Sequence, residues 1–314
     1  MRYIVSTVSR SPLITIVTPV YNMAVYIRET IESVLSQDCA ELEYIIMDGG
    51  STDGTLDILK SYGTRLKYYS APDAGTADAV NKGFARASGS LFGWLSADDT
   101  YLPGTLNTVI RRFLEYRDAV ALHGQGYWVN SGSQTLGAYP SQPADFNRLQ
   151  SDCCICQPAC FFRREAFFKV GGLDPELQFS FDYDLWIRLA KAGQFVCIPD
   201  FLATSRMHTS NKTLGGRGKV FRETFCVLRR HYRYVPFNWI YSYAAWLHDR
   251  RDQFYEPLRP SVFAYALSLP IGCWQNRTAA WRYTREWGSA MTLRGAVHRC
   301  RESRLVRMLQ GLHH

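Results

Sequence analysis

The first hundred residues repeat one pattern: a short apolar segment, a loop rich in turn-forming residues, and a segment with helical periodicity. The apolar segments 13–18, 44–47, 66–70 and 91–95 predict buried strands, and segments 25–36, 55–62 and 77–87 predict the helices between them. Strands that alternate with helices through short connections pair in parallel, and the helices cover the sheet. We therefore expect an α/β fold with a mostly parallel central sheet flanked by helices.

Carboxylates follow three of these predicted strands. Asp48, Asp73 and the pair Asp98–Asp99 each come just after a strand, and ligands of parallel sheets bind beyond the carboxyl ends of the strands. Two adjacent carboxylates repel each other, and a divalent cation that takes oxygen ligands removes that repulsion. The alternative is that this pair caps a helix that begins near Pro103.

These loops lack the two common phosphate-binding patterns. Neither Gly-x-Gly-x-x-Gly nor Gly-x-x-x-x-Gly-Lys-Ser/Thr follows any of the predicted strands. A dinucleotide fold and a phosphate-binding P-loop are therefore disfavoured. An acidic site of this kind would hold phosphates through a bridging metal.

Nine cysteines are present, and four of them cluster at Cys153, Cys154, Cys156 and Cys160. Their spacing lacks two separated Cys-x-x-Cys pairs, so we expect reduced thiols in a cytoplasmic protein and not a zinc site. Residues 1–10 do not resemble a signal peptide. The longest apolar segment, 262–274, is shorter than the ~18 residues of a spanning helix and contains Pro270.

Charge divides the chain into two parts. Residues 1–215 hold 19 Lys and Arg against 22 Asp and Glu, a net charge of −3, whereas residues 216–314 hold 17 against 6, a net charge of +11. Such asymmetry indicates different partners for the two parts. We expect a catalytic domain over 1–215 and a basic, aromatic-rich helical extension over 216–314.

Seven motifs in the first 213 residues occur in the order found in one enzyme family. They are TPVYN (18–22), DGGSTDGT (48–55), DAGTADAVNKG (73–83), SADD (96–99), QPA (157–159), GGLD (171–174) and DYDLWIR (182–188). In this respect residues 12–213 resemble the inverting family 2 glycosyltransferases, which have the GT-A fold. The resemblance covers about two thirds of the chain.

The resemblance implies roles for individual residues. Asp99 would ligate Mn²⁺ or Mg²⁺ on the donor diphosphate, His208 would approach the same metal or diphosphate, and Asp182 would be the general base. The implied donor-binding residues are Thr18, Pro19, Tyr21, Asp48, Asp78 and Asp98, with Asp48 on the nucleobase and Asp98 on ribose or sugar. Two departures stand out: Ser96 or Ala97 replaces the first Asp of the family's Asp-x-Asp motif, and Phe181 replaces a frequent Glu.

Each of these residues also has a purely structural interpretation. Asp182 and Asp184 lie near the start of a predicted helix at 185–192, where Asp182 could be the N-cap. Asp48 and Asp53 could form turns, and Asp78 could begin a helix. His208 could be an ordinary core or surface histidine. Arg188 is expected to form an ion pair inside the domain.

The extension combines aromatic and basic residues. Segment 221–231 predicts a basic amphipathic helix, and Trp239, Tyr241, Tyr243 and Trp246 precede a series of arginines that continues to Arg307. Trp, Tyr and Arg together suit an anionic membrane interface. The alternative is a helical subdomain whose aromatic residues pack on the catalytic domain. A nucleic-acid partner is not expected, because no reading module is present.

Together these features predict a metal-dependent inverting glycosyltransferase. It would move a sugar from a UDP-, GDP- or dTDP-linked donor to a hydroxyl of a glycan or lipid-linked acceptor, in surface polysaccharide, lipopolysaccharide or glycolipid synthesis. We expect a cytoplasmic protein, peripheral at the inner face of the cell membrane. Two alternatives are a non-catalytic nucleotide-sugar-binding protein of the same fold and a sugar-phosphate nucleotidyltransferase, although the Gly-rich basic N-terminal loop of the latter is absent.

Overall fold

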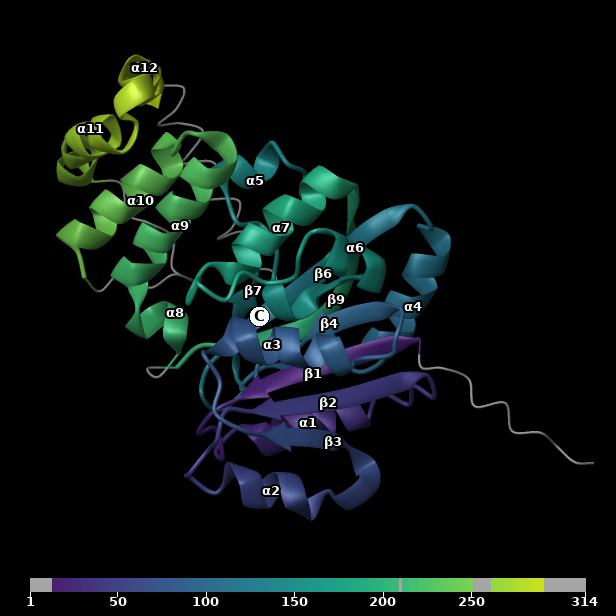
Figure 1. Ribbon diagram of the computed structural model, residues 1–314. Helices are drawn as coiled ribbons and strands as arrows, with labels where there is room; N and C mark the ends of the chain where they lie inside the picture. The colour runs from purple at the N-terminus through teal and green to yellow at the C-terminus, as the bar shows by residue number, and fades with distance from the viewer. Residues whose placement is uncertain (1–12, 209–210, 251–260, 291–314) are drawn as a thin grey trace, which may run out of the picture.

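The computed structural model describes residues 13–208, 211–250 and 261–290. Its centre is one twisted sheet covered by helices on both faces (Figure 1). The strands are β1 Ile14–Val20, β2 Leu42–Asp48, β3 Lys67–Ser70, β4 Leu91–Trp94, β5 Thr100–Tyr101, β6 Ala119–Val129, β7 Thr135–Ala138, β8 Cys160–Arg163 and β9 Gln194–Arg206. The α/β class expected from the sequence is confirmed.

The sheet has a parallel part and a mixed part. The strand order is β3-β2-β1-β4-β8-β6-β9-β5, with β7 beside β6. Strands β1 to β4 pair in parallel, as predicted, whereas β8 is antiparallel to both β4 and β6. The long strands β6 and β9 also pair in parallel, so the described sheet is mostly parallel, as expected, with short antiparallel pairs in its second half.

Helices lie on both faces of the sheet, and those of the C-terminal extension lie beyond one of its faces (Figure 1). The helices are α1 Ile27–Leu35, α2 Thr55–Ser61, α3 Thr76–Arg86, α4 Thr105–Glu115, α5 Arg148–Ser151, α6 Arg164–Lys169, α7 Phe181–Ala192, α8 Lys212–Gly215, α9 Arg217–Tyr232, α10 Phe237–His248, α11 Val262–Gln275 and α12 Ala280–Ala290. Three single 3₁₀ turns, 63–65, 157–159 and 277–279, complete the described elements.

Alternation along the strands creates two apolar layers. In β1, Ile14 and Ile16 point into the layer that holds α1, α2 and α4, whereas Val17 points into the layer that holds α3, α6 and α7. A strand with buried side chains on both faces is typical of a central position in a parallel sheet. The loops at the carboxyl ends of β1 and β4 leave this core, and their residues line the site described below.

The extension shares the core of the catalytic part. Phe221 and Phe225 of α9 belong to the same buried cluster as Trp186 of α7. The aromatic residues expected at a membrane, Trp239, Tyr241, Tyr243 and Trp246, pack half-buried against this cluster. Of these four residues, Trp239 packs on the catalytic part, with its ring 5.5 Å from that of Tyr183 in α7, whereas Tyr241, Tyr243 and Trp246 contact aromatic residues of α9 and α10. A division of the chain at residue 215 stays a prediction.

The eight cysteines in the described ranges are free thiols, and Cys154, Cys156 and Cys160 are buried. Cys300 and the arginines Arg251, Arg294, Arg299, Arg301, Arg304 and Arg307 lie outside the described residues. No described helix combines the length and the apolar character that crossing a bilayer requires.

One buried histidine makes the stability of the fold sensitive to acid. His123 of β6 is 0% exposed and lies 5.6 Å from the ring of Phe195, and burial lowers its pKa to about 4. The unfolded chain binds a proton below about pH 6.5 that the folded chain accepts only near pH 4, so the free energy of unfolding falls as the pH drops through this interval. Urea titrations at neutral and acidic pH should show that His123→Leu weakens this acid dependence. His248→Leu, at an exposed position, is the control and should retain it.

Candidate functional site

A cavity of about 1180 Å³ opens at the carboxyl edge of the parallel strands. Its walls come from six parts of the chain: the loops after β1, β3 and β4, the segment 139–158, the start of α7, and α8 to α10. The parallel register of β1, β2 and β3 places Val20, Asp48 and Ser70 side by side at this edge. The three acidic loops predicted from the sequence thus begin at one edge of the sheet.

The pair Asp98–Asp99 lies on the cavity wall and is largely buried, with exposed fractions of 9% and 6%. The backbone N–H of Arg206 donates to Asp99 Oδ1 at 2.8 Å, and His208 Nε2 lies 2.9 Å from Asp98 Oδ2. Burial, followed by the charge of Asp98, raises the pKa of Asp99 well above its usual range. The helix-cap alternative is wrong for this pair, because the N-cap of α4 is Gly104.

Arg206 holds the two carboxylates in place. Its side chain is 1% exposed, and its guanidinium donates to the carbonyl of Asp98 at 2.7 Å and to Glu29 Oε2 at 2.7 Å. The same group lies over the ring of Tyr26, 4.9 Å from its centroid. The sequence showed Arg206 only as a neighbour of His208, and no local pattern indicated that a buried arginine would support the acidic loop.

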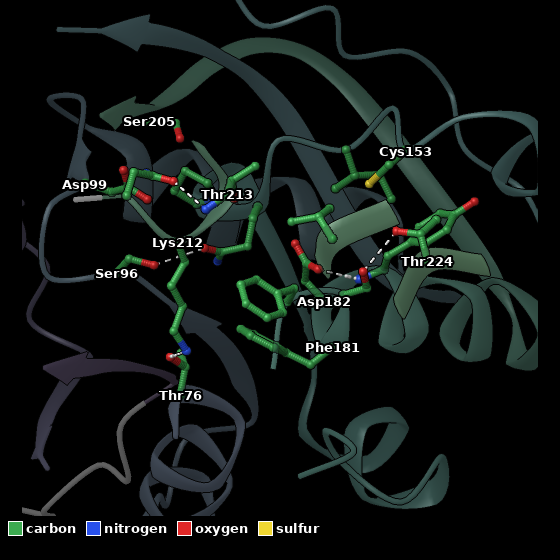
Figure 2. A pocket seen from close by; sticks show the side chains of 18 of the residues that line it. Thr76, Ser96, Asp99, Cys153, Phe181, Asp182, Ser205, Lys212, Thr213 and Thr224 are labelled. Carbon is green, nitrogen blue, oxygen red and sulfur yellow. Dashed lines mark hydrogen bonds between the residues drawn. The ribbon is translucent and has the colours of Figure 1, made fainter. Parts of the chain in front are cut away.

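Asp182 faces the same cavity from the other side (Figure 2). It lies in the first turn of α7, after the N-cap Ser180, and accepts the backbone N–H of Tyr183 at 2.7 Å. Burial is the largest cause that raises its pKa to about 6, and the charge of Glu223 adds to the effect. Asp182 is therefore not the N-cap residue, although its carboxylate accepts one N–H of the first turn.

Glu223 of α9 shapes the segment that leads into α7. Its carboxylate accepts the backbone N–H groups of Gln178, Phe179 and Ser180 at 2.8, 2.6 and 2.5 Å. Three backbone N–H donors on one carboxylate fix the backbone of residues 178–180, which leads into Asp182. Phe181 stands where the family that the sequence resembles often has Glu. Glu223 of α9 brings a carboxylate to the residues just before Phe181. Sequence reasoning missed Glu223, because it lies 41 residues after Asp182.

The remaining predicted donor contacts divide into two groups. Pro19 and Tyr21 line the cavity, and Tyr21 is 61% exposed. Thr18, Asp48 and Asp78 are not among the residues lining it, and their side chains are engaged within the fold. Thr18 Oγ1 lies 3.0 Å from Tyr44 Oη; Asp48 accepts from Ser51 and Ser70; Asp78 accepts from Ala74 and Lys82. Their roles in donor binding stay predictions.

Asp184 and Arg188 have the structural role expected of a domain ion pair. Asp184 is 1% exposed and bonds Arg188 at 2.7 Å and His231 at 2.7 Å. Arg188 also donates to the carbonyls of Val170 and Gly172. The predicted internal ion pair is confirmed. It ties α7 to α9 and to the segment 170–172, two residues from Asp182.

Residues 15–171 match the sequence profile of glycosyl transferase family 2. The chain belongs to this family. An uncharacterized glycosyltransferase of Rickettsia typhi is 30% identical over 65% of this chain. The chain spans 66% of the length of that relative and a smaller share of several others.

Two solved structures share the fold of this chain. The structure of S. aureus TarS 1–349 in complex with UDP-GlcNAc has a TM-score of 0.58 and 15% identity, over 87% of this chain and 92% of TarS. The mannosyltransferase PcManGT of Pyrobaculum calidifontis, in complex with GDP-Man and Mn²⁺, has a TM-score of 0.52 and 18% identity, over 95% of this chain and 81% of that one. The expected GT-A-like fold is confirmed.

The acidic pair Asp98–Asp99 suits a hard divalent cation. Asp98, Asp99 and His208 offer carboxylate oxygens and an imidazole, which are ligands that Mn²⁺ and Mg²⁺ accept when substrate oxygens and water complete the shell. Within the described residues, no three His, Cys, Asp or Glu side chains form a ready-made metal cage. The donor set therefore fits an open site that a diphosphate would complete.

Lys212 introduces a positive charge into this largely acidic cavity. It begins α8, and its Nζ donates to Thr76 Oγ1 at 3.1 Å across the cavity (Figure 2). Burial lowers its pKa, while the charge of Asp73 opposes that change. No local sequence pattern indicated Lys212, because it lies in a short helix four residues after His208.

Proposed function

We propose that the protein is an inverting glycosyltransferase that moves a sugar from a nucleotide diphosphate to an acceptor hydroxyl. The observation that carries this proposal is the placement of Asp99 and Asp182 on one cavity (Figure 2). Asp99 lies beside Asp98 and His208, which could also bind a cation, and Asp182 has a pKa of about 6. Transfer with inversion needs both functions, one for the leaving diphosphate and one for the attacking hydroxyl.

The donor would occupy the side of the cavity nearest the parallel strands. Pro19, Tyr21 and Asp98 line that side, and Lys212 reaches it from α8. A Mn²⁺ or Mg²⁺ ion held by Asp99, with Asp98 and His208 beside it, would neutralise charge on the diphosphate. The complexes of TarS with UDP-GlcNAc and of PcManGT with GDP-Man and Mn²⁺ support a nucleotide-sugar donor and a divalent ion.

Asp182 would remove the proton from the acceptor. The hydroxyl oxygen forms a bond to the anomeric carbon, the bond from that carbon to the diphosphate oxygen breaks, and the hydroxyl proton goes to Asp182. A base whose pKa lies near 6 is ionised at neutral pH and still basic enough to accept a proton in the transition state. Such general-base assistance contributes about 10²–10⁴-fold to the rate.

The acceptor would enter between the catalytic part and the extension. Trp239 and Asn238 of α10 and Phe221 of α9 line the cavity on that side. We propose a glycan or lipid-linked acceptor in surface polysaccharide, lipopolysaccharide or glycolipid synthesis, and action at the cytoplasmic face of the membrane. The basic extension would then face the anionic lipid surface.

Incubation with a panel of UDP-, GDP- and dTDP-sugars and Mn²⁺ tests the activity. We expect nucleotide release with at least one donor and a thermal shift with the matching nucleotide. A thermal shift without release or transfer would support the non-catalytic alternative. Formation of a nucleotide sugar from a sugar phosphate and a nucleoside triphosphate would support the nucleotidyltransferase. No release and no shift with any donor would refute the proposal.

Glu223 provides a further test through the pH profile. Glu223→Gln removes the charge that raises the pKa of Asp182, so the acid limb of kcat should move to lower pH while the donor KM stays unchanged. The measurement is kcat against pH from acidic to neutral values. Glu286→Gln is the matched control, since Glu286 also accepts a backbone N–H, from Phe237, but lies in α12. If the acid limb of kcat in Glu223→Gln lies at the same pH as in the wild type, the assignment of Asp182 as the group that sets this limb is contradicted.

A further inference from the structure

Helix α11 exposes apolar residues where a soluble helix exposes polar ones. Its sequence, VFAYALSLPIGCWQ, contains no charged residue. After its first residue, Val262, the exposed positions recur with helical periodicity on one face: Phe263, Ala266, Pro270 and Trp274. Phe263 is 58% exposed and Trp274 is 61% exposed. We call these four residues the α11 stripe.

The charges around the α11 stripe are positive. From Val262 to Ala290 the basic residues are Arg277, Arg282 and Arg285, all exposed, and the only acidic residue is Glu286. Glu286 is turned inward, since it accepts from Tyr234 Oη and from the backbone N–H of Phe237. The adjacent helix α12 adds Trp281, which is 72% exposed. Arg277 lies over the ring of Trp274, 5.5 Å from its centroid, whereas Arg282 lies over Tyr234 on the inner side of α12. This surface therefore combines exposed tryptophans with the charge of Arg277 and Arg285.

The position and length of α11 suit the plane of a bilayer surface. Helices α11 and α12 form the end of the extension farthest from β3 and α2 (Figure 1). The 14 residues of α11 span about 21 Å, less than the ~30 Å of a hydrocarbon core. An apolar face flanked by arginine and tryptophan is the arrangement of helices that lie in the interface between headgroups and acyl chains.

We propose that the α11 stripe, together with Trp281, Arg277 and Arg285, docks the protein onto an anionic lipid bilayer. The tryptophans and Phe263 enter the headgroup region, and the arginines contact anionic headgroups. This assigns membrane contact to α11 and α12 and not to Trp239–Trp246, whose side chains pack inside. An anionic bilayer is favoured over a protein partner because the stripe offers no polar side chain for specific recognition, while Arg277 and Arg285 add exposed positive charge in the segment that follows it.

Flotation of the full-length protein with phosphatidylcholine vesicles, with and without phosphatidylglycerol, tests the proposal without any sugar chemistry. The wild-type protein should float with the phosphatidylglycerol vesicles and lose most of that binding at high salt. The double variant Trp274→Ser/Trp281→Ser should bind at least about tenfold more weakly. The double variant Arg277→Gln/Arg285→Gln should lose about 25-fold of the preference for anionic vesicles, since each basic residue contributes a factor of about five.

The control is Leu114→Ser/Phe168→Ser, which removes two exposed apolar side chains from α4 and α6. It should float like the wild type. Equal flotation of the tryptophan variant and the wild type would overturn the proposal. The proposal would also be overturned if the wild type were a dimer, the tryptophan variant were a monomer, and both floated equally. The stripe would then join two copies of the protein. Nucleotide release measured without vesicles should be unchanged in every variant, so a failure of docking is distinguishable from a failure of the proposed activity.

Discussion

Asp99→Asn is expected to weaken metal-dependent nucleotide binding by at least about 100-fold, since removing even an outer-shell partner of a metal ligand costs 10- to 100-fold. The asparagine retains an oxygen that can accept the N–H of Arg206, but it removes the negative charge that would hold the cation. The loss should be confined to the metal-dependent part of binding. The measurement is the Kd of the matching nucleotide by calorimetry, with Mn²⁺ and with a chelator.

The choice of asparagine keeps this experiment separate from folding. Asp99 is 6% exposed beside Arg206, so an alanine would leave a buried N–H without its acceptor. Asp57→Asn, on exposed α2, is the matched control and should leave the Kd unchanged. If Asp99→Asn binds nucleotide as tightly as the wild type with Mn²⁺ present, the carboxylate is not the metal ligand.

The fold was predictable where its signals are local. The strand expected at 13–18 is Ile14–Val20, and the helix expected at 77–87 is Thr76–Arg86. Apolar periodicity within a few residues decides these elements. The mixed half of the sheet was not predictable, because β6 pairs with β9 across a separation of about 75 residues, as in the pair Ala119–Gln194. Pairing over that distance depends on tertiary packing, which a short window does not contain.

The site follows the same division. Motif order placed Asp99 and Asp182 in the chain, and the structure brings both to one cavity. Three further residues that shape this cavity had no motif: Arg206 is a buried donor to the acidic loop, Glu223 reaches back from α9, and Lys212 crosses the cavity. Each acts through a partner distant in sequence. Their types, Arg, Glu and Lys, are common on ordinary surfaces, so only the three-dimensional arrangement identifies them.

Asp182→Asn is expected to reduce transfer by about 10²–10⁴-fold while the Kd of the donor changes little, because general-base assistance acts only in the transition state. In the wild type, kcat should rise with pH through about 6 and level off above it, since the pKa of Asp182 is raised and the base must be ionised. The measurements are transfer rates across pH and donor binding by calorimetry.

Stability measurements separate a base from a helix-capping residue. If Asp182 served mainly to accept the N–H of Tyr183, Asp182→Asn would keep that acceptor, whereas Asp182→Ala would lose it at a cost of ~1 kcal/mol of stability, and both would leave transfer near normal. A carboxylate whose pKa is raised by burial is instead destabilising when ionised, so Asp182→Asn should leave the melting temperature unchanged or raise it at neutral pH. Asp184→Asn is the contrast, since it leaves Arg188 and His231 without their buried partner and should lower the melting temperature. Near-normal transfer by Asp182→Asn, with a melting temperature lowered by Asp182→Ala, would assign Asp182 to the helix and require another base.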